Sequence, residues 1–263
     1  MSYSKVSAKV MRTFHNRVKG ALLRQSTHLC SGKSSVLHLL DVGVGRGGDM
    51  FKWDKCQISN VVGYDPEESS IEEANKRYIQ SCLRDNRDYK FVCCPLISDL
   101  HQPSNSMDIV SCQFTIHYFF TSEKVLMEFL TNVHDLLKPG GIFVGTFMDG
   151  DTVMKYTRDG TEDFSNSAML IYFPIPFAKD DFSIPIKVHL TGTLYFGENT
   201  VSNEYVVQQS TLKRACELIG LDLVEFKTFE QHHNEYNNDF KMNVDCTQCS
   251  FTYSSFIFKK SVR

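Results

Sequence analysis

The chain has 263 residues, with 28 Lys and Arg against 31 Asp and Glu and a formal net charge of −3. With 42% hydrophobic and 22% charged residues, the composition excludes a disordered chain, a collagen and a coiled coil. No run of about 18 apolar residues is present to span a membrane, and the first residues lack the apolar centre of a signal peptide. The length predicts one large α/β domain, or one domain with a substantial insertion. Because the nine cysteines follow no disulfide spacing, we expect a reducing, cytoplasmic compartment.

The first forty residues are basic, since they hold seven Lys or Arg and no acid before Asp41. Apolar residues at helical spacing predict a helix over residues 5–26. A basic helix of this kind can contact phosphates or can simply be a solvated surface, and the sequence leaves both interpretations open.

Apolar runs bounded by turn residues predict five buried strands that alternate with helices. The strands are expected at residues 36–42, 61–64, 89–93, 108–112 and 142–147, and two helices at 69–83 and 123–137. The segment Lys138-Pro139-Gly140-Gly141 is expected to stop the second of these helices with a turn. This alternation implies a mostly parallel sheet covered by helices on both faces.

The alternation of strands and helices breaks after Phe147. Residues 150–208 contain irregular strand-like pieces, such as 187–195, and are expected to form an insertion over the top of the sheet. The pattern resumes with a helix at 210–219 and strands at 222–229 and 251–258. The polar, Asn-rich residues 231–248 are expected to be mobile.

A glycine-rich loop follows the first strand, where Gly43, Gly45 and Gly48 match the pattern G-x-G-x-x-G. The pattern alone is weak, but here it follows a buried strand, and Asp65 ends the next strand twenty residues after Gly45. A carboxylate at that place can accept hydrogen bonds from both hydroxyls of a ribose. The sequence therefore predicts a site for a nucleoside-bearing cofactor.

Two acids flank this loop, because Asp41 ends the strand and Asp49 follows the glycines. A dinucleotide would place its pyrophosphate there, against a helix N-terminus, and the two carboxylates would repel it. They would instead attract a zwitterion with a cationic sulfur. The loop therefore favours S-adenosylmethionine, and a nicotinamide-dependent dehydrogenase is the weakest alternative.

Residues 41–53, Asp-Val-Gly-Val-Gly-Arg-Gly-Gly-Asp-Met-Phe-Lys-Trp, resemble the first motif of the mRNA cap guanine-N7 methyltransferases. Further segments resemble other motifs of this family in the family's order, over nearly the whole chain: 12–19, 111–118, 203–207 and 253–259. Residues 146–151 resemble its viral members, in particular the methyltransferase domain of the capping enzyme of a large cytoplasmic DNA virus, asfarvirus type. For a viral protein this implies the host cytoplasm or the virion.

The resemblance implies a Rossmann-like, class I S-adenosylmethionine-dependent methyltransferase fold. That fold is α/β, with a seven-stranded, mostly parallel sheet and helices on both faces. One domain is expected over residues 1–263, with a basic N-terminal helix at 1–30, a core at 34–149 and 209–263, and an insertion at about 150–208 that forms a lid over the cap site.

The implied reaction transfers a methyl group from S-adenosylmethionine to N7 of the terminal guanine of GpppN-RNA, leaving S-adenosylhomocysteine. Guanine N7 carries a free lone pair at neutral pH, so in-line attack requires no general base, and catalysis is expected to come from positioning. The expected partner is the 5′-capped RNA end, with triphosphatase and guanylyltransferase domains in the same polypeptide and no membrane. No metal is expected, because Cys246 and Cys249 lack a second ligand pair at a recognised spacing.

The resemblance also assigns site residues. Cofactor binding is implied for Lys19, Asp41, Gly43, Gly45, Asp49, Asp65, Gln113 and Tyr118. Cap binding is implied for His15, Asn16, His117, Tyr118, Glu204 and Tyr253. Lys19 would meet the methionine carboxylate. Glu204 would accept from guanine N1–H and the exocyclic amine, and His117, Tyr118 and Glu204 would position the base. Phe114 is expected only to pack.

The chain departs from the family pattern at two places. The family usually has an Asp just after the third strand, near the adenine, whereas this chain has Cys93-Cys94-Pro95 and its nearest acid is Asp99. His15 stands where the family often has Asn. Two alternatives therefore stay open: a methyltransferase for another RNA or a small molecule, and a non-catalytic stimulatory subunit of a capping complex.

Overall fold

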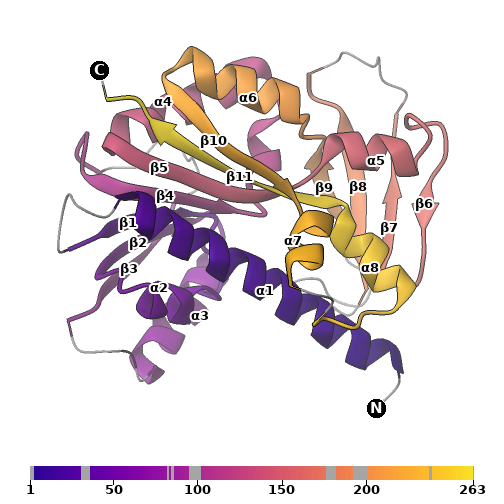
Figure 1. The fold of residues 1–263 in the computed structure, drawn as a ribbon, viewed down its shortest axis with the longest axis horizontal. Helices are drawn as coiled ribbons and strands as arrows, with labels where there is room; N and C mark the ends of the chain where they lie inside the picture. Colours follow the sequence, from indigo (N-terminus) through magenta and orange to yellow (C-terminus); the bar gives the residue numbers. More distant parts are fainter. Residues whose placement is uncertain are drawn as a thin grey trace.

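The structure is a computed structural model that describes residues 3–30, 36–81, 83, 86–94, 102–175, 182–191, 201–236 and 239–262. Its centre is a seven-stranded sheet in the order β3-β2-β1-β4-β5-β11-β10 (Figure 1). The strands are β1 (His38–Val42), β2 (Asn60–Asp65), β3 (Asp88–Cys93), β4 (Met107–Gln113), β5 (Leu137–Met148), β10 (Leu221–Thr228) and β11 (Tyr253–Lys260). β11 pairs antiparallel with β5 and β10, and the other neighbouring strands of this sheet pair in parallel. The predicted mostly parallel sheet is confirmed.

Helices cover both faces of this sheet. One face carries α1 (Tyr3–Cys30), α2 (Met50–Lys55), α3 (Glu68–Gln80), α7 (Phe229–Glu235) and α8 (Val244–Phe251); the other carries α4 (Glu123–Leu136) and α6 (Gln209–Leu218). Successive strand residues enter opposite cores, as Leu39 and Leu40 do in β1, because side chains alternate across a strand. No helix within the described ranges is both long and apolar enough to cross a membrane.

The expected turn at residues 138–141 is wrong in one respect, because this segment lies inside β5. Met107 pairs with Leu137 and Ile109 pairs with Ile142, so two steps along β4 face five steps along β5. The extra residues form an irregularity in which Gly140 has a φ of +74°, a backbone conformation that glycine adopts without steric cost.

The insertion is more regular than expected. It consists of α5 (Gly150–Tyr156) and a four-stranded antiparallel sheet of β6 (Phe164–Ser165), β7 (Met169–Tyr172), β8 (Pro185–Leu190) and β9 (Ser202–Tyr205). Alternating residues such as Ile186 and Val188 are buried and join the core cluster that also contains residues of α1 and α8. Figure 1 shows this second sheet beside the main one, and β9 contacts the segment that follows β4.

The expectation of a mobile segment at 231–248 is wrong for its described part, which contains α7 and α8. Thr228 and Gln231 form a capping box at the start of α7, and Asn243 accepts a hydrogen bond from the backbone of Cys246 at the start of α8. The polar residues therefore cap helices, and buried Phe229 and Cys249 fix the two helices to the core.

Candidate active site

The glycine loop folds back on β2 at the carboxyl edge of the sheet. The backbone N–H groups of Gly43 and Val44 both donate to the carbonyl of Tyr64, at 2.8 and 3.0 Å. A Cβ on Gly43 would lie 2.3 Å from Oγ1 of Thr115, whereas a Cβ on Gly45 would meet nothing within 4 Å. Gly43 therefore serves close packing, and Gly45 borders open space where a ligand can approach the backbone.

Asp65 ends β2 at the mouth of this loop. Its Oδ2 accepts from the backbone N–H of Gly45 at 2.8 Å, and its Oδ1 accepts from that of Glu67 at 3.1 Å. The structure thus brings the loop and the predicted ribose-binding carboxylate together, and it adds a hydrogen bond between them that the sequence did not indicate.

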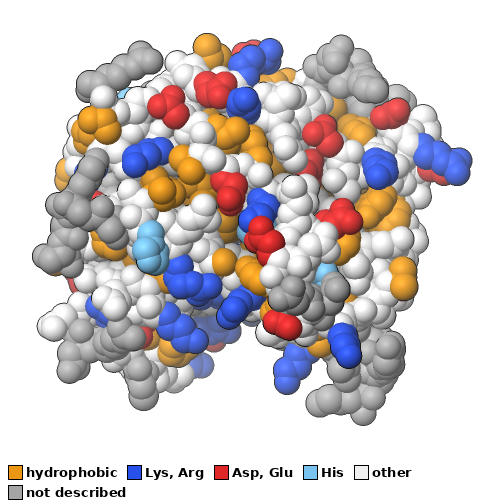
Figure 2. All heavy atoms as spheres, in the orientation of Figure 1, with side chains coloured by type: hydrophobic (Ala, Val, Ile, Leu, Met, Phe, Trp, Pro, Cys, Tyr) orange, Lys and Arg blue, Asp and Glu red, His pale blue; other side chains and the backbone are white. Residues whose placement is uncertain are grey.

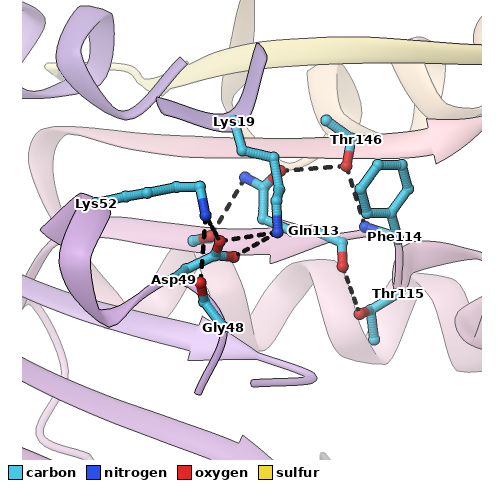
Figure 3. Close-up of polar contacts among 9 residues, drawn as sticks. Lys19, Gly48, Asp49, Lys52, Gln113, Phe114, Thr115 and Thr146 are labelled. Atoms are coloured by element: carbon cyan, nitrogen blue, oxygen red, sulfur yellow. Dashed lines mark hydrogen bonds and ion pairs between the residues drawn. The ribbon is translucent and has the colours of Figure 1, made fainter. Parts of the chain in front are cut away.

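Asp49 lies between two lysines (Figure 3). Nζ of Lys19, which comes from α1, is 2.8 and 2.9 Å from the two carboxylate oxygens, and Nζ of Lys52 is 2.6 Å from Oδ1. Burial alone would raise the pKa of Asp49, but the two ammonium groups outweigh burial and lower it to about 2. Asp49 is therefore ionised and fixes the Lys19 ammonium beside the loop.

Asp41 lies close to this cluster, but its pKa shifts in the opposite direction to that of Asp49. Burial, and then the charge of Asp49, raise the pKa of Asp41 to about 7, although a hydrogen bond with Ser111 opposes the shift. Oδ1 of Asp41 has no hydrogen-bond partner among the described residues. A buried acceptor without a partner is costly, and a donor on a bound ligand would satisfy it.

The end of β4 is held by Thr146 of β5. Oγ1 of Thr146 donates to Oε1 of Gln113 at 3.2 Å and accepts from the N–H of Phe114 at 3.1 Å (Figure 3). Phe114 has a φ of +56°, a strained conformation for a side chain of this size. Its ring lies 5.8 Å from Nζ of Lys19, within range of a cation–π contact. Sequence reasoning missed this role, because no local pattern signals a positive φ at a phenylalanine.

His117 and Tyr118 lie in a short 3₁₀ helix, η2 (Ile116–Phe119), just after β4. Nδ1 of His117 is 3.7 Å from Oε2 of Glu204 on β9, and both side chains are buried. Burial lowers the pKa of His117 and Glu204 only partly offsets it, so the ring is neutral at pH 7. Its Nε2 has no partner within the described part of the chain. Tyr118 is 49% exposed, and its ring centroid is 4.1 Å from that of His117. The structure therefore brings the three predicted residues together.

Tyr253 begins β11 and lies buried in an aromatic cluster. Its ring centroid is 5.1 Å from that of Phe114 and 5.5 Å from that of His15. Nε2 of His15 is 2.9 Å from Oγ of Ser250 on α8. Burial and the nearby Lys19 lower the pKa of His15 to about 3, so this ring is also neutral. The contact with Ser250, 235 positions away, had no signal in the sequence.

The remaining positions that the sequence singles out lie exposed, outside the described residues, or buried in α8. Asn16 is exposed on α1. Cys93 ends β3 opposite Asp65 and its thiol is exposed, whereas Pro95 and Asp99 lie outside the described residues, so the adenine contact stays untested. Cys246 and Cys249 lie buried in α8.

The basic residues of α1 are partly committed to internal contacts. Figure 2 shows Lys and Arg side chains gathered over α1 and α2. On α1, Lys19 binds Asp49, and the guanidinium of Arg17 lies 5.5 Å from the ring centroid of Tyr236. These two basic residues therefore make internal contacts, and phosphate contact by α1 stays a prediction.

Comparisons with known proteins agree with this geometry. A family model described as the mRNA (guanine-N(7))-methyltransferase domain matches residues 2–249. The mRNA cap guanine-N(7) methyltransferase 1 of Arabidopsis thaliana is 28% identical over 84% of this chain and 68% of its own length. The mRNA cap guanine-N(7) methyltransferase of Schizosaccharomyces pombe is 30% identical over 87% of this chain and 64% of its own length.

Solved structures support the fold. An S-adenosylmethionine-dependent methyltransferase from Clostridium acetobutylicum has a TM-score of 0.58 at 15% identity, covering 99% of this chain and 93% of that one. At this identity the likeness concerns the fold alone, which is the Rossmann-like fold of S-adenosylmethionine-dependent methyltransferases. The family is shown by the sequence model, which covers most of the chain. The chain therefore belongs to the mRNA (guanine-N(7))-methyltransferase family.

Proposed function

We propose that the chain methylates N7 of the terminal guanine of GpppN-RNA, with S-adenosylmethionine as methyl donor and S-adenosylhomocysteine as product. The observation that carries the proposal is the meeting of buried His117 and buried Glu204, 3.7 Å apart, at the edge of the sheet where Asp65 and the glycine loop lie. Ligands of open α/β sheets bind at this edge.

The residues around the loop fit S-adenosylmethionine. Gly45 borders open space, Asp65 can accept from ribose hydroxyls, and Asp41 has a buried oxygen that lacks a donor among the described residues. Asp41 would hold the methionine ammonium and Lys19 the methionine carboxylate. When bound, the donor supplies a methyl group activated by a positively charged sulfur.

The second group of residues fits a guanine. The Glu204 carboxylate can accept from guanine N1–H and the exocyclic amine, a donor pair that adenine lacks. Nε2 of neutral His117 has no partner in the described chain and is available to the base, while the rings of Tyr118 and Tyr253 supply aromatic faces. As the guanine ring becomes cationic on methylation, its attraction to Glu204 grows, so Glu204 favours the transition state over the ground state.

The insertion would act as the lid of this site within a single domain. Glu204 supports this role, because it lies on β9 of the insertion while His117 follows β4 of the core. The proposed substrate is the 5′-capped RNA end. Triphosphatase and guanylyltransferase domains in the same polypeptide, a viral origin and a cytoplasmic location remain predictions.

The test is to incubate the chain and labelled S-adenosylmethionine with one substrate at a time: GpppG-RNA, free GTP or tRNA. The variant Asp65→Ala serves as the negative control. We expect label only in GpppG-RNA. Label in tRNA would favour the alternative of another RNA methyltransferase, and failure to bind S-adenosylmethionine by calorimetry would favour a stimulatory subunit.

A further inference from the structure

Asp149, the residue between β5 and α5, has a carboxylate with an unusual set of contacts. Its side chain is 1% exposed. Oδ2 accepts from Nε2 of Gln209 at 2.5 Å and from Oγ of Ser254 at 2.6 Å, and Oδ1 accepts from the backbone N–H of Asp151 at 3.0 Å. Every partner among the described residues is a neutral donor, so the carboxylate is held by hydrogen bonds alone.

These partners lie on three different segments of the chain. Asp151 lies where the chain enters the insertion, Gln209 lies where it returns into α6, and Ser254 belongs to the last strand, β11. One carboxylate therefore joins both ends of the insertion to the main sheet.

The backbone around Asp149 makes the same junction. The N–H of Asp149 donates to the carbonyl of Thr252 at 2.7 Å, and the N–H of Gly150 donates to the carbonyl of Val207 at 2.9 Å. A Cβ on Gly150 would lie 2.6 Å from Cγ1 of Val206 and 2.8 Å from the carbonyl oxygen of Val207. The entering and returning chains thus touch too closely for any side chain at position 150.

The junction is adjacent in sequence to two residues of the proposed guanine site. Glu204 lies five positions before Gln209, and Tyr253 immediately precedes Ser254. The Asp149 carboxylate therefore bonds the segment that carries Glu204 to the strand that carries Tyr253. Small displacements at a reacting centre are costly, since an error of about 1 Å can reduce a rate by about 10²-fold.

We propose that Asp149 is a positioning residue for cap recognition: by tying the insertion to β11, it holds Glu204 at the separation from Tyr253 and His117 that guanine requires. This inference rests on the proposed function of the site. Asp149 acts through other residues, because its own side chain is enclosed by Gln209, Ser254 and the backbone.

The decisive comparison is between Asp149→Ala and Asp149→Asn. Alanine removes three accepted hydrogen bonds. Asparagine keeps an oxygen for Asp151 N–H, and its amide can be satisfied if the Gln209 amide turns and the Ser254 hydroxyl accepts. We expect Asp149→Ala to raise the KM for GpppG-RNA by about 10- to 100-fold while the Kd for S-adenosylmethionine changes less than about twofold. Asp149→Asn should stay within about threefold of the wild type. Ser254→Ala, which removes one bond, should be intermediate and serves if Asp149→Ala does not fold.

Lys260→Met is the matched control for loss of stability. Lys260 is buried at the far end of β11 and donates to Asn105, His134 and Leu137 at 2.7 to 3.0 Å. This variant should lower Tm and leave the KM for GpppG-RNA unchanged. If Asp149→Ala and Ser254→Ala raise KM no more than Lys260→Met does at a similar loss of Tm, the positioning role is wrong.

Hydrogen exchange separates this inference from the proposed function, because it needs no substrate. In Asp149→Ala, or in Ser254→Ala if the former does not fold, exchange should increase at residues 201–209 and stay unchanged in β1 and β2. Unchanged exchange at 201–209 contradicts the junction whatever the substrate is. If the wild type fails to methylate GpppG-RNA while the exchange result holds, the proposed function fails and the cap-recognition role fails with it.

Discussion

Nδ1 of His117 lies 3.7 Å from Oε2 of Glu204, although the two residues are 87 positions apart in the chain. His117 follows the fourth core strand and Glu204 lies on the last strand of the insertion. The guanine site proposed here therefore exists only when the insertion is seated on the core, which explains why its two halves cannot be recognised separately as a site.

Replacing Glu204 tests whether this carboxylate recognises the guanine base. Hydrogen bonds to a charged group contribute about 1.5–3 kcal/mol each, so Glu204→Gln should lower kcat/KM for GpppG-RNA by about 10- to 100-fold. Calorimetry should show nearly unchanged binding of S-adenosylmethionine. The control is Glu128→Gln, an exposed carboxylate on α4 that pairs with Lys124. Equal turnover by the two variants would refute the assignment.

Replacing Lys19 tests the cofactor site. Because Lys19 is bound to Asp49 next to the loop, Lys19→Met should weaken S-adenosylmethionine binding by about 10-fold, the effect of losing about 1.4 kcal/mol. Lys9→Met is a matched change at an exposed position on the same helix and should leave the Kd unaltered. Similar Kd values for the two variants, measured by calorimetry, would remove Lys19 from the site.

Asp41 predicts a pH dependence. Because its pKa is raised from 3.8 to about 7, the folded state binds an extra proton between these values, and stability falls as pH rises through that window. The fall in Tm from about pH 5 to about pH 8 should therefore be larger for the wild type than for Asp41→Asn. Parallel Tm profiles for the two proteins, measured by calorimetry over that range, would show that Asp41 has an ordinary pKa.

The basic helix predicts a salt dependence. If α1 contacts the phosphates of the cap, log Kd for GpppG-RNA should rise with log salt concentration. The slope should shrink in the double variant Arg12→Gln/Arg17→Gln and stay the same in Lys213→Gln/Arg214→Gln, whose residues are exposed on α6. A salt titration of binding that gives the same slope for all three proteins contradicts phosphate contact by α1.

The core of the fold could be predicted because its signals are local. The buried run of β1 and the spacing of Gly43, Gly45 and Asp65 are contained in a short stretch of sequence, and the structure places these residues together. The alternation of Ile186 and Val188 is equally local, but the strands of the insertion are so short that the sequence predicts only irregular pieces there. The capping box of Thr228 and Gln231 was missed because the surrounding residues are polar.

The contacts that assemble the site could not be predicted, because they join distant segments. His15 reaches Ser250 across 235 positions, and Asp149 reaches Ser254 across 105. Ser250 and Ser254 look like ordinary serines in the sequence, and only the pairing of β11 with β5 and the packing of α8 against α1 bring them to their partners.

The most direct test is to locate the transferred methyl group by mass spectrometry of GpppG-RNA after incubation with the wild type and with Glu204→Ala. The account predicts a methyl group on N7 of the terminal guanine with the wild type, and a steep loss of that product with Glu204→Ala. A methyl group at any other atom, or N7 methylation by Glu204→Ala at the wild-type rate, would contradict it.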